Sequence, residues 1–316
     1  MTHPGVNRSA KRWGPWVFKA GATVVITWMA LRGIPLGSIR SGFTHLDLTW
    51  AGLSVAVIIL GLAPVEAARL RCAGALLAED QPGFARWFEI FLSSRPFFYI
   101  LPAAVGAEAM VWARLRQFRW DHRSCGFVVL ATRIWGMSAW SLAAALALGQ
   151  FPGFGPILAR APLWAQQSGF WMAAGGTLAA ASILLPVFLA GRQGVGFAPR
   201  GWKGALAIVA ATLTSVLATS LSAQLASWAA GTPFTFIQSM GLLAFFNFSM
   251  VLPISLGGLG LQEALILFLG VPMGYRPEAL VAFSVLLHLQ RLALCGLGLG
   301  VFLTVRRNAP GTRLPA

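Results

Sequence analysis

The chain has few acidic residues, few cysteines and little charge of either sign. Of its 316 residues, nine are Asp or Glu, three are Cys, and charged residues make up only 10%. Because 57% of the residues are hydrophobic, this composition excludes an ordinary soluble domain and indicates an all-α polytopic membrane protein. The cysteines are too few to form a disulfide framework, so no disulfide is expected.

Recognisable motifs for metal, nucleotide or nucleophilic chemistry are also missing. We find no Walker A sequence, no HExxH, no Cys/His metal spacing and no serine nucleophile elbow. The glycine run at 257–260 follows no strand and is not a dinucleotide fingerprint. We therefore expect no catalytic residues, no metal and no cofactor, and any transport should be passive or driven by an ion gradient.

The excess of basic residues predicts membrane topology and not nucleic-acid binding. The net charge is +15, and most Lys and Arg residues lie in short loops between apolar runs. Cytoplasmic loops of membrane proteins carry such an excess, so we expect no nucleic-acid partner.

Six apolar runs are long enough to cross about 30 Å of hydrocarbon. They cover residues 14–33, 49–70, 125–149, 169–190, 205–223 and 279–304. Two further apolar regions, 87–111 and 236–270, contain helix-breaking residues. The breaks are expected at Pro102, Gly106, Pro253, Gly257, Gly258 and Gly260. A broken backbone survives at membrane depth only where protein or a water-filled cavity covers it, so each region is either a full span or a re-entrant helical hairpin.

The distribution of basic residues favours two hairpins. With cytoplasmic termini and two hairpins, 16 basic residues lie in cytoplasmic segments, Arg69 among them, and 4 lie outside. The count becomes 14 against 6 if only 236–270 spans, 10 against 10 if both regions span, and 8 against 12 if only 87–111 spans. The positive-inside rule therefore favours six spans plus two hairpins, with a full span at 236–270 as the alternative.

The two-hairpin topology divides the single transmembrane domain, 1–316, into two repeats of opposite orientation. The first covers 14–149 and the second 169–304, and each contains two spans, a hairpin and a third span. Paired broken segments in an inverted repeat are typical of transport sites. Composition and topology are compatible with a bacterial inner membrane.

Four charged residues in these segments are candidates for substrate binding. Glu108 is followed 25 residues later by Arg133, and Glu263 is followed 28 residues later by Arg291. Intramembrane carboxylates are costly and indicate a functional site, and the arginine fork matches phosphate oxygens. The alternatives are structural ion pairs, a cap for a helix N-terminus, or arginines that reach the interface.

Five polar residues are possible accessory members of the site. Arg95, Asn247 and Ser249 precede the two breaks, where they either contact substrate or satisfy backbone groups that the breaks expose. Gln262 adjoins Glu263. His288 shares a helical face with Arg291, where it either relays protons or hydrogen-bonds between helices.

The sequence at 252–264 resembles the lysylphosphatidylglycerol synthase transmembrane, or flippase-like, family. The resemblance continues through Gly270, Arg291 and a glycine-rich end, with weaker matches in the first half around 101–108 and 128–133. It implies a multi-span protein that moves an aminoacylated phospholipid or a polyprenyl-linked lipid. The chain departs from the family in having no synthase domain, and in having Gly106-Ala107-Glu108 where many relatives have a Gly-Asp pair.

These observations predict a flippase-like lipid transporter whose substrate is a membrane phospholipid or a polyprenyl lipid. It would move an anionic or aminoacylated phospholipid, or a polyprenyl-phosphate-linked lipid, between leaflets. Alternatives are a secondary transporter of a small solute or ion, an integral-membrane enzyme that acts on lipid headgroups, and an accessory subunit of a lipid- or glycan-synthesis enzyme. A homo-oligomer or a membrane glycosyltransferase partner is compatible with the sequence.

Overall fold

The computed structural model describes residues 8–77, 81–100, 105–118, 120–152, 201–250 and 258–307. Every regular element within these ranges is helical. Before the gap at 153–200 they are α1 (Arg8–Leu31), α2 (Leu36–Thr44), α3 (Leu48–Ala56), η1 (Val57–Leu62), α4 (Ala63–Ala75), α5 (Phe84–Ser94), α6 (Phe97–Ile100), α7 (Val105–Gln117), α8 (His122–Ala147) and η3 (Leu148–Gln150). After it come α12 (Gly201–Ala229), α13 (Phe236–Ser249), α14 (Leu261–Gly270), η5 (Val271–Met273) and α15 (Pro277–Arg307).

Four helices are long and apolar enough to cross a membrane. They are Leu48–Ala75, His122–Gln150, Leu206–Ala229 and Pro277–Val305, of which the shortest has 24 residues and so extends about 36 Å. They agree with four of the six predicted spans. The predicted span 14–33 corresponds to α1, of which the described apolar part, Ala20–Leu31, is shorter. The predicted span 169–190 lies outside the described residues.

Polar caps begin the helices next to the site. The Asp121 carboxylate accepts from the Ser124 backbone at 2.7 Å at the start of α8, and hydrogen bonds from the Ser124 side chain and backbone lower the pKa of Asp121. Thr235 and Gln238 form a reciprocal capping box at the start of α13, in which Thr235 N donates to Gln238 Oε1 at 2.8 Å. Such caps satisfy orphan backbone donors and fix where each helix begins.

The first long helix changes its winding in the middle. Between α3 and α4, the turn η1 is π-helical, and the Ala63 N–H donates to the Ile58 carbonyl five residues back. Pro64 follows directly, and proline inside a helix removes a donor and crowds the carbonyl four residues earlier. The wider turn accommodates that loss, and π-turns often lie at functional sites. It sets the rotation of α4 relative to α3.

Each of the two regions with predicted breaks contains interrupted helices that pack against each other. In the first region α5 packs against α7, and in the second α13 packs against α14. Pro102, Pro253 and Gly257 lie outside the described residues. Gly106 is buried in the first turn of α7. Gly258 and Gly260 have φ values of 82° and 79°, a left-handed conformation that glycine adopts readily and other residues do not.

Each of the two interrupted helix pairs, α5–α7 and α13–α14, packs against a long helix of the other half of the chain. Helix α5 of the first half packs on α15 of the second, and α13 of the second half packs on α8 of the first. Both crossings depend on glycine: a Cβ on Gly298 would collide with the Leu92 carbonyl of α5, and one on Gly241 would collide with Ala147 of α8. Small residues let membrane helices approach this closely. In addition, α4 packs on α12, so the halves are joined along their length.

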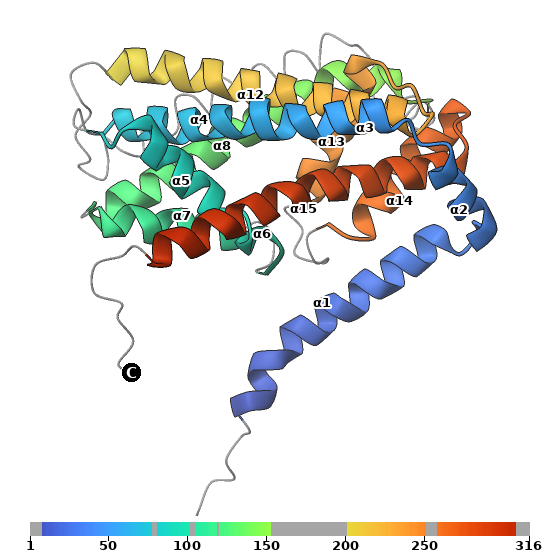
Figure 1. Cartoon of the computed structure of the whole chain (residues 1–316), viewed down its shortest axis with the longest axis horizontal. Helices are drawn as coiled ribbons and strands as arrows, with labels where there is room; N and C mark the ends of the chain where they lie inside the picture. Colours follow the sequence, from blue (N-terminus) through green and yellow to red (C-terminus); the bar gives the residue numbers. More distant parts are fainter. Residues whose placement is uncertain are drawn as a thin grey trace, which may run out of the picture.

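Figure 1 shows α1 diverging from the bundle toward its N-terminal end. The C-terminal part of α1 contacts α14, where Gly260 lies directly against Thr23 and Thr27. Val24 and Trp28 on the same helix are 67% and 61% exposed, as expected for side chains that face lipid.

Candidate functional site

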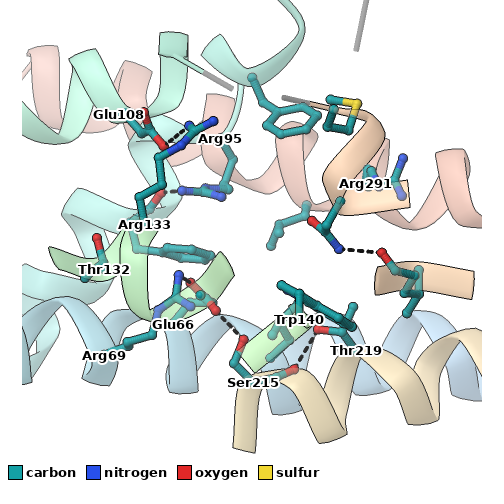
Figure 2. A pocket seen from close by; sticks show the side chains of 18 of the residues that line it. Glu66, Arg69, Arg95, Glu108, Thr132, Arg133, Trp140, Ser215, Thr219 and Arg291 are labelled. Atoms are coloured by element: carbon teal, nitrogen blue, oxygen red, sulfur yellow. Dashed lines mark hydrogen bonds and ion pairs between the residues drawn. The ribbon is translucent and has the colours of Figure 1, made fainter. Parts of the chain in front are cut away.

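A cavity of about 310 Å³ lies between the two halves of the chain (Figure 2). The first half contributes residues of α4, α5, α7 and α8, and the second half contributes residues of α12, α13 and α15. Polar and charged side chains form much of its lining: Glu66, Arg69, Arg95, Glu108, Thr132, Arg133, Ser215, Thr219, Asn247 and Arg291. Both broken regions therefore reach the same cavity.

Glu108 and Arg133 face each other across the gap between α7 and α8. Arg133 Nη1 donates to Glu108 Oε1 at 2.5 Å, and the two side chains are 31% and 30% exposed. The pair lies on the cavity wall, so its exposure leads into the cavity (Figure 2). The two predicted site residues are thus in direct contact.

A second ion pair on α4 lines the cavity as well. Arg69 Nη2 contacts Glu66 Oε2 at 2.8 Å, and the Ser215 hydroxyl of α12 donates to Glu66 Oε1. The Arg69 guanidinium rests against Gly136 of α8, where an added Cβ would come within 3.2 Å of Nη1. Arg69 Nε is buried without a hydrogen-bond partner in the part of the chain that the structure describes.

Sequence reasoning missed this second pair. The positive-inside count includes Arg69 among the basic residues of the cytoplasmic segments, but Arg69 lies inside α4 and lines the cavity. A usable signal was present, because Glu66 is a carboxylate within an apolar run and follows Pro64, which is the pattern that drew attention to Glu108. Ser215, Thr219 and Trp140 gave no comparable signal, since such residues are common in membrane helices.

Arg95 lies at the end of α5, between Ser94 and the aromatic ring of Phe91. Its Nη2 donates to the Ser94 hydroxyl at 3.2 Å, and its guanidinium carbon lies 4.2 Å from the Phe91 ring centroid. Within the described ranges it forms no ion pair with a carboxylate. The hydroxyl and the ring hold the guanidinium at the cavity wall.

Arg291 enters the cavity from the opposite side, on α15 (Figure 2). Its Nη1 donates to Gln262 Oε1 at 2.6 Å, and the guanidinium lies 4.3 Å from the Phe246 ring centroid. Gln262 is fully buried, and its amide nitrogen donates to the Ser284 carbonyl at 3.0 Å. Gln262 therefore orients Arg291, and its own orientation is fixed by α15.

Glu263 faces away from the cavity lining and joins α14 to α15. Its Oε2 accepts from the Gly260 N–H at 2.7 Å, and its Oε1 accepts from Ser284 Oγ at 3.0 Å and contacts His288 Nε2 at 2.9 Å. Both Glu263 and His288 are 7% exposed. The carboxylate thus caps the N-terminus of α14, which is the structural alternative weighed above. His288 Nδ1 is buried without a hydrogen-bond partner in the same ranges.

The two polar residues before the second break make local backbone bonds. Asn247 Nδ2 donates to the Leu243 carbonyl at 2.8 Å and lines the cavity. Ser249 Oγ donates to the Phe246 carbonyl at 2.7 Å near the end of α13. Both bonds satisfy carbonyls near the helix end, and Asn247 combines this bond with a position on the cavity wall.

The chemistry that this lining supports is anion binding. Arginine presents a planar fork of donors that fits phosphate or carboxylate oxygens. In the described part of the chain, no group of three or more His, Cys, Asp or Glu side chains gathers as metal ligands would. The cavity volume is near the lower end of ligand pockets, about 300–1,000 Å³, which suits a small polar headgroup.

Comparison with known proteins places this site in a membrane family. No curated protein matches the chain. The family model described as the lysylphosphatidylglycerol synthase TM region matches residues 16–298, which includes every residue of the cavity lining. The chain belongs to the lysylphosphatidylglycerol synthase TM region family and is an integral membrane protein.

Proposed function

We propose that this protein is a flippase-like transporter that moves the headgroup of a membrane lipid through the cavity between its two halves. The substrate would be an anionic or aminoacylated phospholipid or a polyprenyl-phosphate-linked lipid. The observation that carries this proposal is the lining, in which arginines from both halves face one cavity flanked by both broken regions. The headgroup would enter the cavity while the hydrocarbon chains stay in the bilayer.

The arginines would bind the phosphate, and neighbouring side chains would hold the arginines in place. Arg133 is oriented by Glu108 and Arg291 by Gln262, so each side chain is held in place before a ligand arrives. A preordered guanidinium loses less conformational entropy when it binds, and this strengthens recognition. No covalent step is required of these groups, and we assign none.

The reciprocal packing supports an inverted repeat with two re-entrant hairpins. Helix α5 on α15 and α13 on α8 are equivalent contacts if α5 corresponds to α13 and α8 to α15. Helix α13 has 14 residues and so extends about 21 Å, which is shorter than the hydrocarbon core. Two short arms that return on themselves fit this length better than a full span does.

Alternating access would follow from that architecture. Ligand sites of inverted-repeat transporters lie between the halves, which move against each other around the bound substrate. Here α4 and α12 would form the shared axis, and the two crossings at Gly241 and Gly298 would form the sliding contacts. We further propose that the membrane is a bacterial inner membrane and that both termini lie in the cytoplasm, an orientation that the positive-inside count supports.

A transporter of a small soluble anion is the second candidate, and the size of the cavity favours it. A volume of about 310 Å³ accommodates a free anion as readily as a lipid headgroup. The two candidates differ in whether hydrocarbon chains accompany the charged group, and this difference can be measured directly.

Reconstitution tests the proposal. Vesicles with the purified protein and acyl-labelled fluorescent phospholipids would be treated with dithionite, which quenches only the outer leaflet. We expect faster loss of the protected fluorescence than in protein-free vesicles, and loss of that acceleration in Arg133→Gln and Arg291→Gln. Arg276→Gln is the matched control, because this arginine is 70% exposed and forms its ion pair with Glu278 outside the cavity. Uptake of radiolabelled phosphate without any lipid movement would reject a flippase in favour of the solute transporter.

A further inference from the structure

Among the described residues of the lining, positive charge exceeds negative charge. In this part of the chain four arginines line the cavity (Arg69, Arg95, Arg133 and Arg291) together with two glutamates, Glu66 and Glu108. No other carboxylate in the described ranges lines it, because Glu263 is turned toward His288 and the remaining described ones lie at helix ends or in surface pairs. The described lining therefore has two more cationic than anionic side chains.

Both carboxylates are already occupied by arginines of the same wall. Glu66 contacts Arg69 and accepts from Ser215, and Glu108 contacts Arg133. A cationic group on a ligand would have to compete with these guanidiniums for the same oxygens. The wall thus offers a cation no ready partner.

Arg95 and Arg291 lie at two separate places on the cavity wall. Arg95 is bonded to a hydroxyl and stacked on Phe91, and Arg291 is bonded to an uncharged amide and stacked on Phe246. Both are close enough to the Cys295 thiol, which lies on the cavity wall, to interact with it electrostatically. Figure 2 shows Arg95 beside Arg133 at one side of the cavity and Arg291 at the other. A ligand between them is reached by donors from two directions.

Lipid headgroups differ in the charge they bring to such a lining. A phosphodiester such as phosphatidylglycerol carries one negative charge, and a lysyl ester on it adds two amino groups and makes the headgroup cationic. A phosphomonoester carries about 1.5 to 2 negative charges at pH 7. Because charges in a partly desolvated cavity are costly unless matched, the headgroup with about two negative charges fits best.

We infer that this cavity selects a lipid headgroup with about two negative charges on phosphate, a phosphomonoester or a diphosphate, and rejects aminoacylated headgroups. The inference rests on the proposed function, and it narrows the three substrate classes offered there. The residues that set the preference are Arg95 and Arg291, which add charge, and the two ion pairs, which leave no carboxylate for a ligand cation. Phosphatidic acid and prenyl phosphates belong to the selected class.

Binding to the intact protein in nanodiscs tests the selectivity. The probes are dioleoyl phosphatidic acid, dioleoyl phosphatidylglycerol and its lysyl ester, which share their acyl chains and differ only in headgroup, and native mass spectrometry reports their occupancy. We expect phosphatidic acid to bind at least tenfold more tightly than phosphatidylglycerol, with the lysyl ester weakest. Equal or tighter binding of the lysyl ester by the wild-type protein would overturn the inference without need of any variant.

Two variants test which residue sets the preference for phosphatidic acid over phosphatidylglycerol. Arg95→Gln should reduce the advantage of phosphatidic acid over phosphatidylglycerol to about threefold or less. Arg86→Gln should leave it unchanged, because Arg86 pairs with Glu89 on the surface and does not line the cavity. An unchanged preference in folded Arg95→Gln would contradict the assigned role of that residue.

Inorganic phosphate and pyrophosphate separate a lipid site from a site for free anions. Weak binding of both, with tight binding of phosphatidic acid, supports a lipid headgroup site. Tighter binding of the free anions than of phosphatidic acid would overturn the lipid assignment. If vesicles with the protein move lipids but prefer the lysyl ester, only the selectivity fails. If phosphatidic acid binds tightly and no lipid is moved, the proposed function fails and the phosphate site stands.

Discussion

The two broken regions have similar sequences but use their carboxylates differently. In the first, Glu108 faces the cavity and contacts Arg133 directly. In the second, Glu263 is buried against Gly260, Ser284 and His288, and the preceding residue, Gln262, makes the contact with Arg291. A shift of one residue thus replaces a charged partner by a neutral one, so this contact orients Arg291 without cancelling its charge. The asymmetry contributes to the positive surplus of the cavity.

The largest effect is expected when each carboxylate is truncated and the losses are compared. Glu263→Ala leaves three buried groups without their acceptor and should lower the free energy of unfolding by about 3–5 kcal/mol. Glu108→Ala removes a pair that is about one-third exposed and should cost about 0–1 kcal/mol. Thermal or denaturant unfolding in detergent measures both. Similar losses for the two variants would show that the regions are equivalent in stability after all.

Making the second region resemble the first should weaken lipid binding next most strongly. Gln262→Glu gives Arg291 a carboxylate partner, and we expect phosphatidic acid to bind about tenfold more weakly because one unit of surplus charge is removed. Nanodisc binding provides the measurement. Gln238→Glu is the matched control, since a glutamate also completes the capping box at the start of α13 and Gln238 does not line the cavity. Equal losses in both variants would show that the effect is not local.

Making the first region resemble the second should have a smaller effect of opposite sign. Glu108→Gln preserves a hydrogen-bond acceptor for Arg133 and removes its charge partner, so phosphatidic acid should bind about threefold more tightly. Exchange between leaflets should become slower, because a tighter site releases its ligand less readily. The same binding and dithionite measurements apply. A weaker affinity would mean that Glu108 helps to bind the ligand itself.

The smallest effect is expected when the Ser215 hydroxyl, which links α12 to Glu66 of α4, is removed. Ser215→Ala removes one hydrogen bond to the Glu66 carboxylate, which still forms its ion pair with Arg69. We expect the free energy of unfolding to fall by about 0.5–1.5 kcal/mol. Lipid affinity should stay within about twofold. Ser249→Ala is a suitable reference, since that hydroxyl bonds only to its own helix in the described contacts. A large loss of affinity in Ser215→Ala alone would place the second ion pair at the centre of recognition.

Much of the fold could be predicted from the lengths of the apolar runs and from the positions of the helix-breaking prolines and glycines. Four long helices lie where the apolar runs predicted them, and α5–α7 and α13–α14 are interrupted in the two regions that proline and glycine indicated. These features depend on composition over many residues, and such averages are robust to small errors of register. The ion pair of Glu108 with Arg133 was one of the alternatives that the sequence left open for these two residues.

The features that could not be predicted depend on how each helix is rotated about its own axis. Adjacent residues on a helix point about 100° apart, so sequence spacing could not decide whether Gln262 or Glu263 would contact Arg291. The same limit applies to α4, where the π-turn rotates Glu66 and Arg69 into the cavity. Periodicity assumes regular winding, and it fails where a helix departs from that winding.

Because of that π-turn, the direction in which α4 side chains point can change without any substitution in the cavity lining. A turn of this kind differs from an ordinary one by a single extra amino acid, so the loss of one codon within 57–62 would restore regular winding and swing Glu66 and Arg69 a quarter-turn or more away from the opening. Relatives that gained or lost this one position would share the same charged residues but point them in another direction. A comparison of residue identities alone would not detect the resulting difference in the ligand-binding site.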